Sequence, residues 1–121
     1  MERNFGVLLL LSLAACGQAV APQSRPGAAP TIVSLNPCTD AVLAEVADPG
    51  QIVAISAYSH DPASSSMDLA VARRFPATAG TVEELLALRP QLVIGTPFMS
   101  PASVQAIGRL GLRLERVGIA T

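Results

Sequence analysis

Short apolar runs alternate with longer segments of helical spacing from residue 31 to the end of the chain. Four runs rich in aliphatic residues predict β-strands, at 31–35, 51–56, 91–96 and 112–118. Apolar spacing and helix-start residues predict helices between them, at 39–47, 67–75, 81–90 and from 100 onward. Strands of about five residues joined by helices of about ten imply βαβ crossovers. We therefore predict an α/β fold with a Rossmann-like, doubly wound parallel sheet of about four to five strands.

The first thirty residues differ in pattern from this alternating region. A polar start is followed by an apolar run from Phe5 to Ala15, which is shorter than the about 20 residues of a membrane-spanning helix. Residues 1–15 are thus predicted to be a signal peptide rather than a buried helix. The run ends in Leu-Ala-Ala-Cys16, which resembles the lipobox of bacterial lipoproteins, so Cys16 is the expected site of lipidation and of a membrane anchor.

The segment after Cys16 is rich in proline and small residues and lacks any apolar period. We interpret residues 16–30 as the lipidated cysteine followed by a flexible tether, and residues 31–121 as the folded domain. If Cys16 carries lipid, Cys38 has no partner within the chain. We expect Cys38 to be a small, half-buried residue in a loop rather than a reactive or ligating thiol.

Composition narrows the classes of partner. The chain has 121 residues, half of them apolar, and its net charge is −1. It holds one Tyr and no Trp, and its arginines form no run longer than Arg73-Arg74, so neither the basic face nor the stacking aromatics of a nucleic-acid-binding protein are present. We expect no nucleic-acid partner.

In a doubly wound sheet, ligands bind beyond the carboxyl ends of the strands. The loops expected there are 36–38, 57–62, 77–80 and 97–99. They present three large side chains, Tyr58, Phe98 and Met99, which suit contact with a large, partly apolar ligand. The alternative is that Phe98 and Met99 only cover the helix that begins at Ser100.

The same loops do not indicate catalysis or metal binding. Ser59, His60 and Asp61 are consecutive and cannot converge as a triad, so we interpret them as a solvated turn. His60 is the only histidine, and no glycine-rich phosphate loop occurs. We predict neither an enzyme, a metal site nor a cofactor; a flavodoxin-like enzyme is the least favoured alternative.

Three segments carry a resemblance to a known family: "TIVSLNPCTDAVLAEVADPGQIVAIS", "AYSHDP" and "TVEELLALRPQLVIG". They resemble the N-terminal lobe of the class III periplasmic substrate-binding proteins, which serve bacterial ABC importers of vitamin B12, ferric siderophores and haem. The resemblance implies an exported, often lipid-anchored protein of the periplasm or cell surface. It also implies two Rossmann-like lobes joined by one long helix, with a metal chelate such as a corrinoid, ferric siderophore or haem held between them.

The resemblance also suggests roles for individual residues. Asn36 and Pro37 would face the cleft, Tyr58 and Ser59 would contact the chelate, and Glu83 would pair with arginines of the ABC importer permease. An acid in a first helical turn is the alternative for Glu83, and Glu84 is assigned to a capping box with Thr81. Because such proteins need a second lobe, we expect this sequence to be a fragment or a one-lobed relic. A lipid-tethered interaction module is the alternative function.

Overall fold

The computed structural model describes residues 27–118. The predicted signal peptide, Cys16 and the tether up to residue 26 lie outside the described residues, as do residues 119–121. Residues 27–30, the end of the predicted tether, are exposed and belong to no helix or strand. The signal peptide and the lipidation of Cys16 therefore stay predictions.

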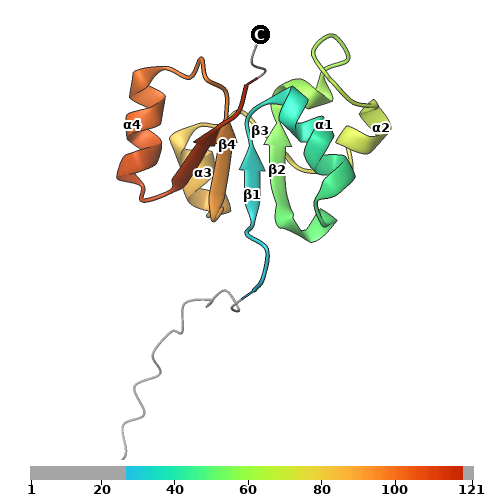
Figure 1. The fold of residues 1–121 in the computed structure, drawn as a ribbon. Helices are drawn as coiled ribbons and strands as arrows, with labels where there is room; N and C mark the ends of the chain where they lie inside the picture. The colour runs from blue at the N-terminus through green and yellow to red at the C-terminus, as the bar shows by residue number, and fades with distance from the viewer. Residues whose placement is uncertain (1–26, 119–121) are drawn as a thin grey trace, which may run out of the picture.

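The described residues form a five-stranded sheet flanked by helices on both faces (Figure 1). In chain order the elements are β1 (Ile32–Ser34), α1 (Pro37–Val46), η1 (Pro49–Gln51), β2 (Ile52–Ser56), η2 (Ala57–His60), α2 (Leu69–Ala72), β3 (Ala77–Thr78), α3 (Val82–Leu88), β4 (Leu92–Gly95), α4 (Pro101–Arg109) and β5 (Arg113–Arg116). Every pairing is parallel and the strand order is β3-β2-β1-β4-β5. This confirms the predicted doubly wound α/β fold.

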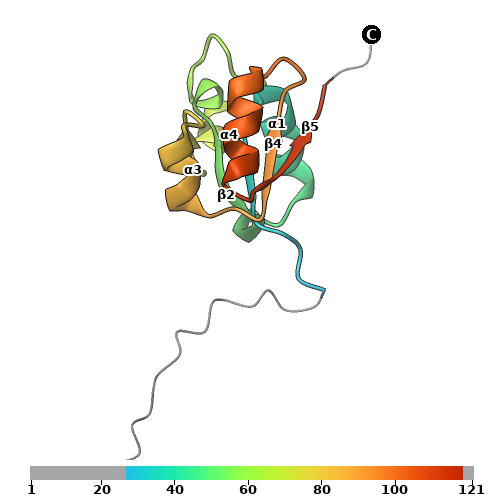
Figure 2. The same cartoon turned by 90° about the vertical axis from the view of Figure 1, so that its left-hand side faces the viewer.

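Residues of the strands enter two separate cores, one on each face of the sheet. On one face, Ile32 and Ile55 pack with Leu43 of α1 and Ala72 of α2. On the other face, seen with its helices in front in Figure 2, Val33, Ala54 and Val93 pack with Leu85 of α3 and Ile107 of α4. Because both faces are covered, the strands carry aliphatic residues at successive positions rather than alternating with polar ones.

The structure corrects three predicted boundaries. Residues 77–80 were expected to be a loop, but Ala77 and Thr78 form β3, paired with Ile55 and Ser56 of β2. The helix expected at 39–47 begins earlier, at Pro37, because the Asn36 side chain accepts the backbone N–H of Cys38 and caps it. The helix expected at 67–75 is reduced to one turn, Leu69–Ala72, capped by Asp68.

The expected capping box is confirmed at α3. The Thr81 hydroxyl accepts the Glu84 N–H, and the Glu84 carboxylate accepts the Thr81 N–H. The helix ends at Leu88, followed by Arg89 in the left-handed region with φ 47°. α3 starts at Val82, two residues after Gly80, at the edge of the sheet where β3 ends.

We expect Gly80→Ala to destabilise the fold by about 1–2 kcal/mol, because an L-residue is strained at positive φ. Gly80 has φ +76°, and an added Cβ would lie 2.8 Å from a methyl carbon of Leu35. Gly50→Ala is the matched control, since no atom lies within 4 Å of its Cβ position; its change should stay within about 0.5 kcal/mol. Urea denaturation measures both, and equal stability of the two variants would contradict this account.

Candidate functional site

The topology places a crevice between β1 and β4. The chain leaves β1 through α1 toward β2 and β3, whereas it leaves β4 through α4 toward β5 on the other side. The two connections diverge, so the loops after β1 and β4 leave a gap at the carboxyl edge, where open α/β sheets bind ligands.

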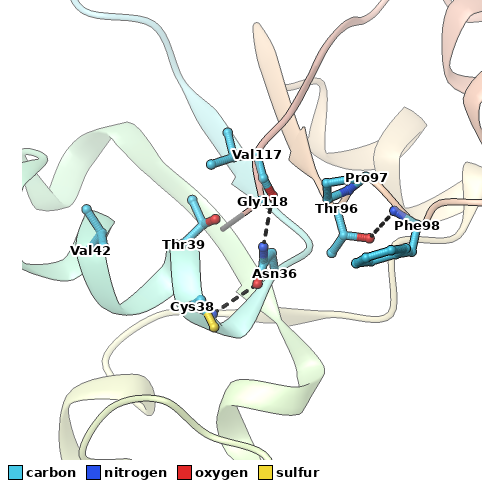
Figure 3. Close-up of a pocket in the computed structure, with 9 residues that line it drawn as sticks. All are labelled: Asn36, Cys38, Thr39, Val42, Thr96, Pro97, Phe98, Val117 and Gly118. Carbon is cyan, nitrogen blue, oxygen red and sulfur yellow. Dashed lines mark hydrogen bonds between the residues drawn. The ribbon is translucent and has the colours of Figure 1, made fainter. Parts of the chain in front are cut away.

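A pocket of about 570 Å³ lies at this crevice (Figure 3). Its lining comes from the loop after β1, the first turns of α1, the loop after β4 and the segment after β5: Asn36, Cys38, Thr39, Val42, Thr96, Pro97, Phe98, Val117 and Gly118. Asn36 joins the start of α1 to the segment after β5, because its Oδ1 accepts the Cys38 N–H at 3.0 Å and its Nδ2 donates to the Val117 carbonyl at 3.4 Å. We call it the switch-point pocket.

Apolar side chains of the switch-point pocket are open to solvent. Phe98 is 93% exposed and Val42 is 58% exposed, and Val117 and Pro97 are exposed as well. Only the backbone of Phe98 is held, through its N–H to the Thr96 hydroxyl at 3.3 Å. An exposed apolar cluster around a pocket is typical of a surface that contacts a ligand or a partner.

A second, smaller pocket of about 210 Å³ lies beyond β2 and β3 at the same edge. It is lined by Leu35, Ser56, Ala57, Tyr58, Thr78 and Ala79. Tyr58 projects from η2 and is 65% exposed. We call it the tyrosine pocket.

The residues predicted to bind a ligand occupy different places relative to the two pockets. Asn36 and Phe98 line the switch-point pocket, and Tyr58 lines the tyrosine pocket. Pro37 lines neither and starts α1. Met99 is half-buried and packs against the core under α3 and α4, with its sulfur filling the space beside Gly95. The alternative prediction was that Phe98 and Met99 only cover the helix that begins after Ser100. Met99 packs in this way, whereas Phe98 does not.

Ser59 takes a role different from the predicted ones. Its side chain is fully buried, and its hydroxyl donates to the Asp40 carboxylate at 2.6 Å. His60 is half-buried, with its Nε2 3.0 Å from the Ala72 carbonyl oxygen and 3.1 Å from that of Phe75. Interpreting these two residues as a solvated turn was wrong, because α1 and α2 close over them; Asp61 alone is exposed.

Asp40 was not singled out by the sequence analysis. It lies in the first turn of α1, is fully buried, and its Oδ2 accepts the Ser56 N–H at 2.9 Å as well as the Ser59 hydroxyl. Burial raises the pKa of Asp40 above its ordinary value, and the nearby Ser34 hydroxyl, the Ser59 hydroxyl and the Ser56 N–H oppose that rise. No local pattern indicated Asp40, since its partners, the Ser56 N–H and the Ser59 hydroxyl, lie 16 and 19 residues away in the sequence.

The remaining candidates lie at the same edge. Cys38 has a free, exposed thiol in the first turn of α1, so the predicted half-buried loop position was wrong. Glu83 is exposed in the first turn of α3. Hydrogen bonds from the Thr78 hydroxyl and the Thr81 N–H lower the pKa of Glu84. Within residues 27–118, no three His, Cys, Asp or Glu side chains gather into a group that could hold a metal ion.

Val42, Val117 and Gly118 line the switch-point pocket but were not predicted to do so, and the geometry of the fold explains their positions. Val42 lies about one helical turn after Cys38 and Thr39, so it shares their face of α1. Val117 and Gly118 follow β5, whose pairing with β4 brings the chain back across the crevice, as the Val117 N–H to Gly95 carbonyl bond shows. No helix among the described residues has the length and apolar character needed to cross a membrane.

We expect the stability advantage of the natural chain over Asp40→Asn to shrink as pH rises from about 3.8. The raised pKa means that ionisation costs more in the folded than in the unfolded chain. The contribution of Asp40 to the free energy of unfolding is therefore complete below its ordinary pKa and is lost as pH rises through its folded pKa. Asparagine cannot ionise and lacks this loss.

Urea denaturation at a series of pH values between about 3 and 7 measures that difference. Asp48→Asn is the matched control, because Asp48 is exposed at the opposite edge of the sheet. A stability advantage over Asp40→Asn that widens with rising pH would contradict the assigned direction of the pKa shift.

Known proteins resemble the chain at the level of fold. The periplasmic haem-binding protein HutB of Vibrio cholerae superposes with a TM-score of 0.53 at 21% identity, over 72% of this chain and 33% of that one. A periplasmic haem-binding protein from Pseudomonas aeruginosa gives a TM-score of 0.58 at 22% identity, over 74% of this chain and 32% of that one. RhuT from Roseiflexus sp. RS-1, also a periplasmic haem-binding protein, gives 0.50 at 23% identity, over 69% and 32%.

The chain therefore spans about a third of the length of these solved structures. Comparison with curated protein sequences gives no match. The sequence profile of the periplasmic binding proteins matches residues 32–109, which is most of the region that the structure describes. With its parallel sheet and its crevice between β1 and β4, the chain belongs to the periplasmic binding protein family.

Proposed function

We propose that residues 32–118 form the N-terminal lobe of a substrate-binding protein that delivers a metal chelate to an ABC importer. The exposed, mainly apolar switch-point pocket carries this proposal. Its volume of about 570 Å³ falls within the ordinary range of small-molecule sites. The metal would arrive within the chelate as cargo, so the lobe needs no metal ligands of its own.

The chemistry of the rim suits a large and partly apolar chelate. Phe98 offers an aromatic face that is almost entirely free, and the phenol of Tyr58 adds a second one with a polar end. Between them, the Asn36 amide supplies a polar group beside apolar walls. Haem is the first chelate to test because the similar solved structures are haem-binding proteins. A corrinoid and a ferric siderophore are the other members of the proposed ligand class.

We expect the 121-residue chain to bind hemin saturably and Phe98→Ser to weaken that binding by about tenfold or more. Burying an aromatic side chain against a ligand contributes about 1.5–3 kcal/mol, and serine removes most of that apolar area. Because Phe98 is almost fully exposed, its loss should leave the melting temperature unchanged. Titrations followed by haem absorbance measure the affinity, and thermal denaturation provides the test of folding.

Leu86→Ser is the matched control. Leu86 is 51% exposed on α3 and lines neither pocket, so its replacement removes a similar exposed apolar group away from the rim. Equal weakening by both variants would mean that hemin adsorbs to apolar surface in general. If hemin, cobalamin and a ferric siderophore all fail to bind saturably, the switch-point pocket is not a chelate site and the interaction-module alternative takes its place.

Transfer to the importer would use the acidic first turn of α3. Glu83 is exposed there, and α3 begins at the same carboxyl edge as the two pockets, so a permease seated over the rim would meet it. An exposed acid presented on a rigid helix suits pairing with arginines of a partner surface. We propose this docking role alongside the capping assignment of Glu84.

We expect Glu83→Lys to reduce haem uptake by cells that depend on this protein by roughly tenfold, while hemin affinity stays within about twofold. Glu45→Lys is the matched control, because Glu45 is equally an exposed helical acid but lies in the later part of α1. Uptake that is unchanged by Glu83→Lys, or reduced equally by Glu45→Lys, would remove Glu83 from the docking role.

In this proposal, the first sixteen residues determine where the protein is located in the cell. Export through residues 1–15 and lipidation at Cys16 would place the lobe in the periplasm or at the cell surface, held to a membrane by its lipid. The Pro- and Ala-rich segment that follows would let the folded lobe reach the permease.

A further inference from the structure

A buried carboxylate joins the helix beside one pocket to the turn that carries the aromatic residue of the other. Asp40 lies in α1 directly after Thr39, which lines the switch-point pocket. Its Oδ2 accepts the backbone N–H of Ser56 at 2.9 Å and the hydroxyl of Ser59 at 2.6 Å. These two serines are the second residue before and the first residue after Tyr58, so the carboxylate holds the chain on both sides of it.

The backbone of Tyr58 itself is held within the same turn. Its N–H donates to the Ser56 hydroxyl at 3.3 Å, and its carbonyl accepts the N–H of Asp61 at 3.2 Å. His60 fixes the end of the turn, because the two groups facing its Nε2 are the Ala72 and Phe75 carbonyl oxygens, which only accept, so this nitrogen donates. Both backbone polar groups of Tyr58 are thus hydrogen-bonded, whereas its phenol side chain projects into solvent.

Stability alone does not account for an acid at this position. Both hydrogen bonds go to Oδ2, and Oδ1, although buried, has no hydrogen-bond partner among the described residues. A buried carboxylate with one unsatisfied oxygen costs free energy that a smaller or neutral side chain would avoid. What the Asp40 carboxyl group does supply is a short bond of 2.6 Å from the Ser59 hydroxyl, which together with the Ser56 N–H bond to the same oxygen fixes the geometry of the turn.

We propose that Asp40 is a positioning residue for ligand binding: through Ser59 and Ser56 it fixes the direction in which Tyr58 enters the rim, and it ties that direction to α1 beside the switch-point pocket. The inference rests on the proposed chelate-binding function. Its physical basis is that a side chain held in its bound geometry loses less conformational freedom when the ligand arrives.

The sequence provides a direct probe of this positioning. Tyr58 is the only tyrosine and the chain has no tryptophan, so its intrinsic fluorescence reports this one side chain. We expect Ser59→Ala and Asp40→Asn to increase the amplitude of fast depolarisation in time-resolved tyrosine anisotropy of the ligand-free protein. Thr31→Val is the control, since it removes a hydroxyl that accepts the Gln91 N–H at the opposite edge of the sheet.

Hemin titration provides the second readout. Ser59→Ala should weaken hemin binding by about tenfold, which is a typical coupling between residues that act together. If Ser59 acts through Tyr58, the same substitution should cause no further loss of hemin affinity in a Tyr58→Ala background. Any effect of Ser59→Ala on the melting temperature should persist in that background. This separation distinguishes a residue that acts through Tyr58 from one that only stabilises the fold.

The two readouts also separate the inference from the proposed function. Anisotropy needs no ligand, so failure of hemin, cobalamin and a ferric siderophore to bind would overturn the proposed chelate site while the anisotropy still reports on Asp40. If Tyr58 depolarises equally in the natural chain, Ser59→Ala and Thr31→Val, the positioning role is overturned, and Ser59→Ala answers this even if Asp40→Asn fails to fold. An undiminished loss of hemin affinity in the Tyr58→Ala background would overturn it as well.

Discussion

Parallel strand pairing requires all five strands to point the same way, and this brings their carboxyl ends to one edge of the sheet. The loops after β1, β2, β3 and β4, which are far apart in the sequence, become neighbours there. Both pockets, the first turn of α3 and the turn with Tyr58 lie along this edge. The crevice itself exists because the connections after β1 and β4 diverge, so the location of the site follows from strand order before any side chain is considered.

At this edge the usual partition of side chains is inverted. Asp40 and Ser59 are buried, whereas Phe98 and Val42 are exposed. Hydrophobic burial would favour the opposite arrangement, and each exposed aromatic or aliphatic side chain forgoes about 1.5–3 kcal/mol that burial would return. Elsewhere the strands follow the ordinary rule, with Val33, Ile55 and Val93 inside. The burial of polar side chains is therefore local to this edge, whereas exposed apolar side chains such as Val46 and Leu86 also occur away from it.

The fold was predictable from sequence because the strongest signals are repeated. Uninterrupted aliphatic runs at 51–56 and 91–96 indicate strands covered on both faces, and the helical spacing between them leaves few topologies. β3 was missed because two residues, one of them threonine, carry no apolar pattern. The start of α1 was misplaced because Asn36 and Pro37 suggest a loop as readily as a cap and a first turn.

The site was less predictable, because burial at a loop depends on what packs over it. Tyr58 and Ser59 are adjacent and both polar, yet one is exposed and the other is buried under α1. No local pattern separates them, since the distinction arises from Asp40, which lies 19 residues before Ser59 in the sequence. For the same reason the adjacent residues Phe98 and Met99 differ: Phe98 is exposed to solvent, whereas Met99 packs against the core.

Phe98 and Tyr58 belong to different pockets, and this division bears on the kind of ligand that the edge can hold. A compact ligand would occupy the switch-point pocket and leave Tyr58 without a role. A wide, rigid ligand could lie across both, and its affinity would then depend on how rigidly the protein holds the two aromatic side chains relative to each other. α1 starts at one pocket, and Asp40 bonds it to the turn at the other. Under the proposed positioning role, the buried carboxylate would be the element that lets the two pockets act as one surface.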